Sequence, residues 1–295
     1  MAIPDSVLQD KEFASQALAD YLRNGQLALI IGAGISSQLG LPLWWQLVHG
    51  CAERAGLVDL IDEATEKTPS ETLRQLMDKV EDRIGDQEKY KSLVKDVLYS
   101  DAEFTETIIR ERLLIAIGAL LMSSKRGKID IVINFNFDDL LERYLSLHGF
   151  EAQVIARMPS ILRDSDVTVY HPHGFLPSEG KLGALESDAL VLSQYSYDDL
   201  LGAETNPWRR LIESTLLSKI GLFVGISGQD PTFGPLLVAV KKQIALERTT
   251  GFWLLGPNEP KSSDFEKRNV IPLRFDSYDE MPTFLLQVCQ LAARR

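Results

Sequence analysis

Hydrophobic positions along this chain follow two patterns that alternate. Short unbroken apolar runs, of which residues 27–31 are the first, are typical of strands buried on both faces of a parallel sheet. Longer segments repeat apolar residues at spacings of three and four, which is typical of helices with one buried face. The alternation predicts parallel pairing in a doubly wound, Rossmann-like α/β sheet. The expected strands are 27–31, 129–133, 153–155, 167–170, 221–225, 252–255 and 270–275, and the expected helices around them are 10–23, 138–145, 206–218, 236–247 and 278–293.

Residues 51–124 interrupt this alternation. Charged residues are dense there, apolar residues such as Leu73, Leu76, Met77 and Val80 recur at helical spacing, and no strand is evident. We expect a helical module inserted between the first and second strands. The predicted organisation is therefore a sheet domain formed by residues 1–50 and 125–295, with 51–124 as the insert.

The first apolar run leads directly into Gly32, Ala33 and Gly34. Glycines allow a tight turn and a close approach of the backbone to a ligand. A helix is expected to follow, and the N–H groups at its start would form an anion site suited to a diphosphate. Ser37 stands where the dinucleotide fingerprint has Gly or Ala, so a glycine-rich turn that binds no ligand is the alternative.

Four expected strand ends carry polar residues or glycines. In a doubly wound sheet, ligands bind at the carboxyl ends of the strands. Each end taken alone has a simpler explanation: Asn136 or Asp138 could cap a helix, and His173 could be a turn histidine. The convergence of all four on one crevice predicts a binding site. The four segments are 32–34, 136–138, 173–174 and 225–227.

Composition restricts the possible partners and the compartment. A net charge of −11 argues against direct binding to nucleic acid or to anionic membranes. The two cysteines, Cys51 and Cys289, form no Cys-x-x-Cys motif, so we expect no thiolate zinc site and no other metal, and their scarcity fits a reducing cytoplasm. Residues 1–5 lack the features of a signal peptide, and the longest apolar run, 113–122, is about half the length needed to span a bilayer. We expect a soluble, cytoplasmic protein.

Taken in order, the four polar strand ends resemble the sirtuin superfamily. The segments are Gly-Ala-Gly-Ile-Ser at 32–36, Asn-Phe-Asp at 136–138, His-Gly at 173–174 and Gly-Ile-Ser at 225–227. The form of residues 136–142, and Gly-Leu-Pro at 40–42 followed by Trp44, are more similar to the divergent prokaryotic sirtuin-like branch whose members are effectors of antiphage defence systems. The resemblance covers roughly residues 25–50 and 129–290. The four-cysteine zinc module and the Asp-Phe-Arg element of deacetylating sirtuins are both missing from this sequence.

The resemblance implies a Rossmann-like sirtuin fold and an enzyme that consumes NAD⁺. It implies a glycohydrolase that releases nicotinamide and ADP-ribose and depletes NAD⁺ during infection, as an abortive-infection effector. Nicotinamide in NAD⁺ is a cationic leaving group, so no general acid is needed, and the ribose passes through an oxocarbenium-like state. The sequence leaves open whether the ADP-ribosyl group is released by hydrolysis or by cyclisation.

The resemblance also implies roles for individual residues. Asn136 would orient the ribose and the attacking water, Asp138 would contact the nicotinamide amide, and His173 would act as the general base. His171 is the rival base, because residues two apart in an extended segment share a face; the His-Gly pattern favours His173. The expected NAD⁺-binding residues are Gly32, Ala33, Gly34, Ser36, Asp138, Gly225, Ser227 and Asp230, with Gly225, Ser227 and Asp230 near the adenosine ribose.

Regulation and two competing functions stay open. The family implies control by homo-oligomerisation or by a partner protein, such as a DNA-translocating ATPase or another phage sensor. A non-catalytic module that binds NAD⁺ or ADP-ribose as a signal would bind nucleotide and release no nicotinamide. A zinc-free protein deacylase would require an acylated peptide for nicotinamide release.

Overall fold

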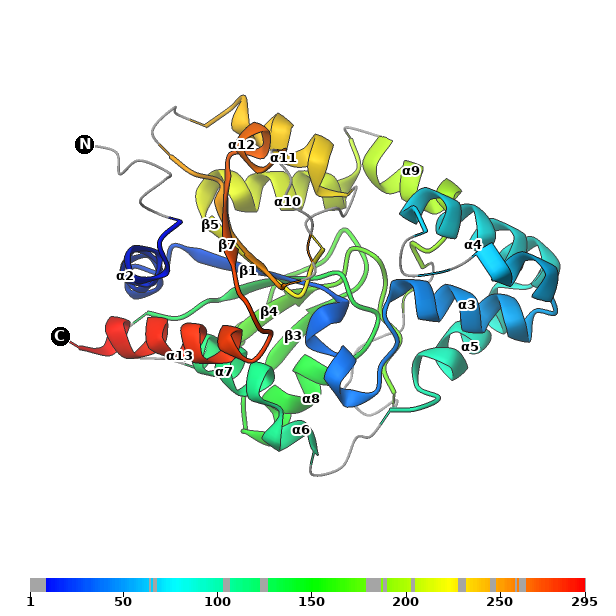
Figure 1. Cartoon of the computed structure of the whole chain (residues 1–295), viewed down its shortest axis with the longest axis horizontal. Coiled ribbons are helices and arrows are strands. Elements are labelled where there is room, and N and C mark those ends of the chain that lie inside the picture. Colours follow the sequence, from blue (N-terminus) through cyan, green and yellow to red (C-terminus); the bar gives the residue numbers. More distant parts are fainter. Residues whose placement is uncertain are drawn as a thin grey trace.

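A single parallel sheet of seven strands, in the order β3-β4-β2-β1-β5-β6-β7, organises the computed structural model (Figure 1). The central strand β1 (Leu27–Ile31) is buried along its whole length. It pairs in parallel with β2 (Ile131–Asn134) on one side and with β5 (Ile220–Val224) on the other. The remaining strands are β3 (Ala152–Ile155), β4 (Val167–Tyr170), β6 (Gly251–Leu255) and β7 (Val270–Arg274), all joined in parallel.

The structure describes most of the chain. The described residues are 9–63, 65, 68–102, 107–122, 127–178, 187, 190–202, 205–227, 232–244, 248–257, 259 and 264–294. Across this part of the chain, no helix is both long enough and apolar enough to cross a membrane.

Helices cover both faces of the sheet, as the buried strands require. Alternate residues of β1 enter two different cores: Leu27, Leu29 and Ile31 face one, and Ala28 and Ile30 face the other. The predicted doubly wound, Rossmann-like α/β fold is confirmed. The first core is covered by α2 (Lys11–Arg23), α7 (Arg112–Leu121), α8 (Leu140–Leu147) and α13 (Glu280–Ala293), and the second by α10 (Pro207–Ser218), α11 (Phe233–Lys241) and α12 (Asp264–Arg268).

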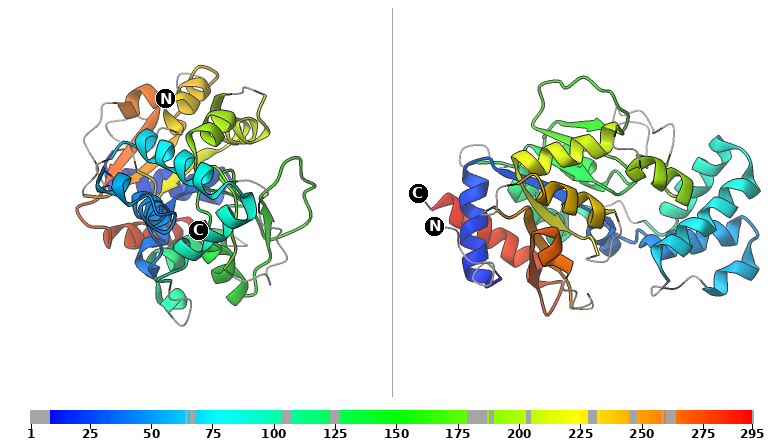
Figure 2. Two further views of the ribbon diagram at one scale, coloured as in Figure 1. Left: turned by 90° about the vertical axis from the view of Figure 1, so that its right-hand side faces the viewer. Right: turned by 90° about the horizontal axis from the view of Figure 1, so that it is seen from above.

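Every described element between residues 51 and 124 is helical. Helices α3 (Trp44–Arg54), α4 (Ser70–Ile84) and α5 (Gln87–Leu98) pack on one another, and they extend from one end of the sheet domain (Figure 2). We call these three helices the helical module. The short element η3 (Val58–Glu63) packs on α3, whereas α6 (Thr107–Arg110) contacts α7 and α8, and α7 packs against α13 beside the sheet. Helix α9 (Gln194–Gly202) packs against α4.

The segment after β1 differs from its prediction. An α-helix was expected directly after the glycines, but two 3₁₀ helices, η1 (Ala33–Ile35) and η2 (Ser37–Leu39), stand there, and the next α-helix begins at Trp44. Gly40 has a left-handed φ of +81° and lies against the backbone of Asp101, which ends the helical path. Elsewhere the predicted strands and helices agree to within about three residues; residues 245–247, the end of one predicted helix, lie outside the described residues.

Candidate functional site

The carboxyl ends of β1, β2 and β5 lie side by side. After β1 the chain adds strands on one side of it, and from β5 onward on the other, and this switch point is the usual ligand position in such folds. The ends of β1 and β5 are in backbone contact, because Gly34 N–H donates to the carbonyl of Gly225 at 2.9 Å. A Cβ atom on Gly34 would lie 2.8 Å from the Cα of Gly225, and Gly225 itself has a φ of +69°. Both positions therefore require glycine, and the sequence signal at 32–34 and 225 has a steric cause.

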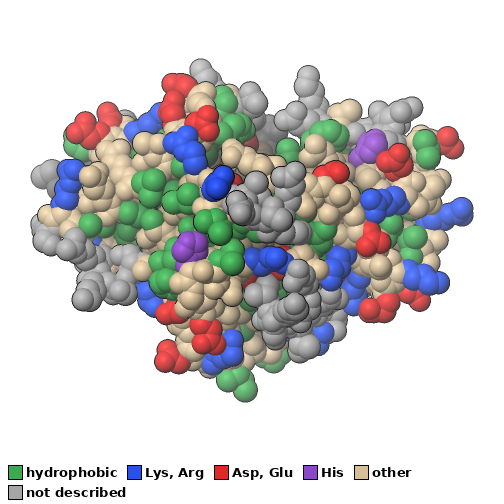
Figure 3. Space-filling view, turned by 90° about the horizontal axis from the view of Figure 1, so that it is seen from below, with side chains coloured by type: hydrophobic (Ala, Val, Ile, Leu, Met, Phe, Trp, Pro, Cys, Tyr) green, Lys and Arg blue, Asp and Glu red, His purple; other side chains and the backbone are tan. Residues whose placement is uncertain are grey.

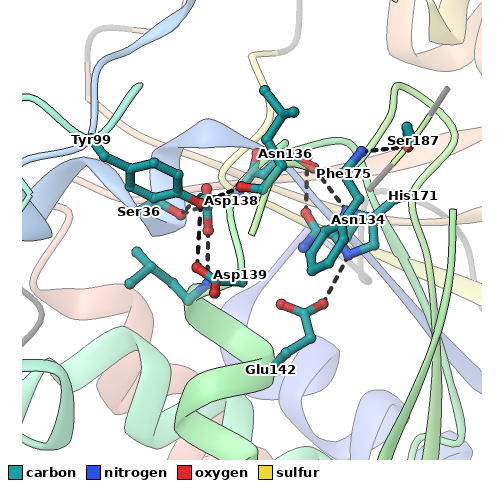
Figure 4. A network of polar contacts seen from close by, with 12 residues as sticks. Ser36, Tyr99, Asn134, Asn136, Asp138, Asp139, Glu142, His171, Phe175 and Ser187 are labelled. Atoms are coloured by element: carbon teal, nitrogen blue, oxygen red, sulfur yellow. Dashed lines mark hydrogen bonds and ion pairs between the residues drawn. The ribbon is translucent and has the colours of Figure 1, made fainter. Parts of the chain in front are cut away.

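A buried hydrogen-bond network joins the ends of β1 and β2. The Nδ2 of Asn136 donates to the carbonyl of Gly32 and to Oγ of Ser36, both at 3.2 Å. Oγ of Ser36 donates in turn to Oδ2 of Asp138 at 3.0 Å. Ser36, Asn136 and Asp138 are almost completely buried, and they point toward one another in Figure 4. Four residues predicted from two separate motifs thus form one unit.

Asp138 also serves the helix that follows it. Its Oδ1 accepts a hydrogen bond from Leu140 N–H at 3.1 Å, at the first turn of α8. Burial raises the pKa of Asp138 to about 7, and the hydrogen bonds from Leu140 and Ser36 act in the opposite direction. The carboxyl group is therefore present in both protonation states near neutral pH. A group of this kind can both donate to and accept from a carboxamide.

His173 lies next to this network. Its ring packs edge-on against Phe135, with 4.8 Å between the ring centroids, and lies 6.4 Å from the ring of Phe137. Its Nε2 is buried and makes no hydrogen bond within the described part of the chain. Burial, with a contribution from the positive charge of Arg74, lowers the pKa of His173 to about 3. The imidazole is therefore neutral at physiological pH, with a ring nitrogen that the described residues leave unsatisfied.

His171 occupies a different environment from His173. It is fully buried, its Nδ1 lies 2.9 Å from the carbonyl oxygen of Asn136, and its Nε2 lies 2.9 Å from Oε1 of Glu142. Both ring nitrogens are thus engaged by the protein, so neither is open to a substrate (Figure 4). This geometry supports His173 over His171 as the candidate base and gives His171 a positioning function on Asn136.

Three residues near the site carried no functional prediction. Glu142 holds His171, as described above. Asn134 accepts the backbone N–H of Asn136 at 3.0 Å through its Oδ1, while its own Nδ2 is buried without a hydrogen bond in the described chain. Asp139 receives the hydroxyl of Ser178 at 3.0 Å and lies 3.2 Å from the hydroxyl of Tyr99. The polar run that follows the strand was the available signal for all three.

The remaining predicted residues are placed less centrally. Ala33 opens η1 between the two glycines. Ser227 is exposed and donates to Oε2 of Glu259 at 3.1 Å, and no hydrogen bond joins it to Asn136 or Asp138. Asp230 lies outside the described residues. The structure therefore brings together Gly32, Gly34, Ser36, Asn136, Asp138, His173 and Gly225.

The described residues contain no group of three or more His, Cys, Asp and Glu side chains that could hold a metal ion. The two cysteines are free thiols in separate elements, with Cys51 in α3 and Cys289 in α13.

The strand ends thus combine a glycine-lined contact, an adjacent polar network and a buried imidazole nitrogen that makes no hydrogen bond to the described residues. Residues 130–273 match the family model of the SIR2-like domain. This range contains Asn136, Asp138, His173 and Gly225 and begins after the glycine turn at 32–34. A search of curated proteins found no match. Together with the parallel sheet and its polar strand ends, the match supports a place for this protein in the sirtuin-like superfamily, whose SIR2-like members are NAD-dependent enzymes.

Proposed function

We propose that this protein is an NAD⁺ glycohydrolase. The observation that carries the proposal is the unsatisfied Nε2 of His173 beside the buried Gly32–Ser36–Asn136–Asp138 network. Buried polar atoms in proteins are nearly always hydrogen-bonded, so an unsatisfied one near a predicted site points to a ligand. The SIR2-like match supports NAD⁺ as the substrate.

Asn136 and His173 have different functions in the proposed hydrolysis. The bond between the ribose C1′ and the nicotinamide nitrogen breaks, nicotinamide leaves as a neutral base, and the oxygen of a water molecule bonds to C1′. Asn136 is suited to hold this water, because its Nδ2 is fixed by Gly32 and Ser36 and its Oδ1 accepts no hydrogen bond from the described chain. His173 accepts a hydrogen bond from a ribose hydroxyl or from the water. Because its pKa is about 3, the released proton passes on to solvent.

The other predicted residues would contact the parts of NAD⁺ on either side of the reacting ribose. Asp138 would face the nicotinamide carboxamide, and the backbone of the turn at 32–34 would lie close to the diphosphate. Gly225 and Ser227 would lie toward the adenosine ribose.

The biological role that we propose is an abortive-infection effector of antiphage defence in the cytoplasm. The support is the resemblance of residues 40–44 and 136–142 to sirtuin-like defence effectors. An enzyme that depletes NAD⁺ must be restrained in uninfected cells, so we propose activation by homo-oligomerisation or by a partner protein that senses the phage.

A second candidate is a non-catalytic module that senses NAD⁺ or ADP-ribose. The observation that favours it is the low pKa of His173, since an imidazole with a pKa of about 3 is a weak base. Such a module would bind nucleotide through the same residues and leave the glycosidic bond intact.

Nicotinamide release from NAD⁺ by the purified chain separates these functions. Wild type, Asn136→Ala and His173→Ala are compared over a range of protein concentrations without any acylated peptide. His148→Ala is the matched control, because this histidine is exposed at the end of α8. Release that is lost in the first two variants and retained in the control supports the hydrolase.

Two outcomes would count against the proposed hydrolase. Release that is unchanged in Asn136→Ala and His173→Ala would contradict the proposed site. If wild type releases nothing, cellular NAD⁺ is measured after expression in phage-infected cells, and an unchanged NAD⁺ level would leave the sensor as the better account.

A further inference from the structure

Arg74 of helix α4 is a largely buried cation with no anionic partner among the described residues. The residue as a whole is only 8% exposed to solvent. Its Nε donates to Oε1 of Gln194 at 2.9 Å, and its guanidinium carbon lies 3.8 Å from the ring centroid of Tyr197. Neither Nη nitrogen makes a hydrogen bond to the described residues, and none of their carboxylates lies within 4.0 Å.

This arrangement leaves the guanidinium fork open to a further group, because neither Nη nitrogen is among the fully buried side-chain atoms that lack a hydrogen bond. Arginines with so little exposure are normally paired, because removing a charge from water carries a penalty. One hydrogen bond and one cation–π contact engage only part of the guanidinium, and its four Nη N–H donors make no hydrogen bond to the described residues. The two Nη groups form a planar fork that matches the oxygens of a phosphate.

Arg74 lies on the His173 side of the candidate site. The segment that leads into α9 is fixed to His173, because Val191 N–H donates to the carbonyl of His173 at 2.7 Å. Gln194, three residues further on, is the partner of Arg74. Helices α4 and α9 pack together, as Figure 1 shows. The positive charge of Arg74 also contributes to the low pKa of His173.

We propose that Arg74 is an anion-binding residue of the candidate site and that it holds a phosphate of a dinucleotide. The identity of the dinucleotide rests on the proposed function, whereas the choice of an anion rests on the open cationic fork of Arg74 itself. The proposal gives the helical module a direct part in substrate binding, because α4 supplies a cation to the site.

Binding of ADP-ribose and adenosine tests the proposal, because only the first carries phosphates. Affinities are measured by calorimetry for wild type, Arg74→Gln, Arg74→Lys and Arg83→Gln. Arg83 is the matched control, since it is exposed on the same helix. We expect Arg74→Gln to weaken ADP-ribose binding at least tenfold and to leave adenosine binding unchanged. Arg74→Lys keeps the charge but not the fork, so its affinity should lie in between, and Arg83→Gln should match wild type.

Three results would overturn this inference. They are an unchanged ADP-ribose affinity in Arg74→Gln, an equal loss of ADP-ribose and adenosine binding, and an absence of ADP-ribose binding by wild type. Arg74→Lys and the thermal unfolding midpoint of each variant guard against misreading a folding defect. If ADP-ribose binding depends on Arg74 while nicotinamide release is absent, the inference stands and the proposed hydrolysis fails.

Discussion

Asp138 is a buried carboxyl group whose pKa lies at about 7 instead of 3.8. Between these two pH values the unfolded chain loses the proton while the folded chain retains it. The folded state then binds more protons, so the contribution of this group to stability is lost as the pH rises. At about 1.4 kcal/mol per pH unit, the free energy of unfolding falls by roughly 4 kcal/mol between pH 3.8 and about 7 because of this group.

We therefore expect Asp138→Asn to gain stability relative to wild type as the pH increases from 4 to 7. The measurement is the free energy of unfolding in urea at several pH values. Asp96→Asn, an exposed position on α5, is the control and should follow wild type throughout. A constant difference between Asp138→Asn and wild type over this range would show that the carboxyl group is not held protonated by the fold.

The His171–Glu142 pair is a second buried unit at the residue scale. Nδ1 of His171 faces a carbonyl and must carry a proton, and a second proton lies between Nε2 and the carboxyl group of Glu142. His171→Ala would leave Glu142 and the Asn136 carbonyl buried without partners, at a cost of about 3–5 kcal/mol. Glu142→Gln keeps a hydrogen bond to Nε2 and should cost much less.

Chemical denaturation of these two variants beside His148→Ala measures the difference. Loss of nicotinamide release in His171→Ala is also expected, because His171 fixes the backbone of Asn136. Equal stability losses in His171→Ala and the exposed His148→Ala would contradict a positioning function for His171.

Site residues whose positions depend on the neighbouring strand or turn could be predicted from the sequence. Gly34 and Gly225 are required by a local steric contact, and Asn136 and Asp138 follow a buried strand directly. Arg74 could not be found in this way, because its partner Gln194 is 120 residues distant along the chain. Helical spacing placed Arg74 among the charges of a predicted helix, and only the packing of α4 on α9 shows that it is buried.

At the scale of elements, hydrophobic runs predicted the strands well because a strand buried on both faces leaves a continuous apolar signal. The turn after β1 was less predictable. Gly-Ala-Gly suggested an α-helix, but two 3₁₀ turns follow, since Gly40 and Pro42 stop the helical path. The strand β2 is shifted by one or two residues relative to its prediction for a different reason. The apolar pattern does not define where pairing with β1 begins.

The contact between β1 and β5 yields a prediction for these elements. Gly34→Ala would place a Cβ atom 2.8 Å from Cα and 3.0 Å from the carbonyl oxygen of Gly225, and backbone atoms cannot move aside cheaply. We expect a loss of about 1–3 kcal/mol and weaker NAD⁺ binding. Gly234→Ala in α11 has the guanidinium of Arg268 at 3.9 Å as its nearest neighbour and should be stabilising by up to about 1 kcal/mol.

Unfolding free energies and NAD⁺ titrations of the two alanine variants provide the comparison. Similar behaviour of Gly34→Ala and Gly234→Ala would mean that the strand ends can separate without cost, and the steric account of the glycine turn would be wrong.

At the scale of the whole molecule, the helical module is the part whose function the sequence left most open. Acidic and basic side chains gather over it at the right of Figure 3. The predicted insert, residues 51–124, stays a prediction, and α7, within that range, packs on α13 beside the sheet. If the phosphate assignment of Arg74 holds, the module completes the site on the His173 side and takes a direct part in binding.

The exposed helices of this module also provide the surface on which we propose that copies of the chain assemble. Lys79 on α4 and Lys89 on α5 are exposed, and the chain already carries a net charge of −11. Reversing both to glutamate adds repulsion between like-charged modules, so we expect a smaller oligomer at a given concentration and less nicotinamide release. Light scattering and the release assay are run over the same concentration range.

Lys242→Glu with Lys267→Glu is the matched control for this prediction. Both lysines are exposed, one at the end of α11 and one on α12, so the two double variants carry the same net charge. A charge effect on the whole molecule would change both variants equally, whereas an interface on the helical module would change only the first. If oligomer size and activity are unchanged in the first variant, the module is not the assembly surface, and substrate binding through Arg74 becomes its main proposed function.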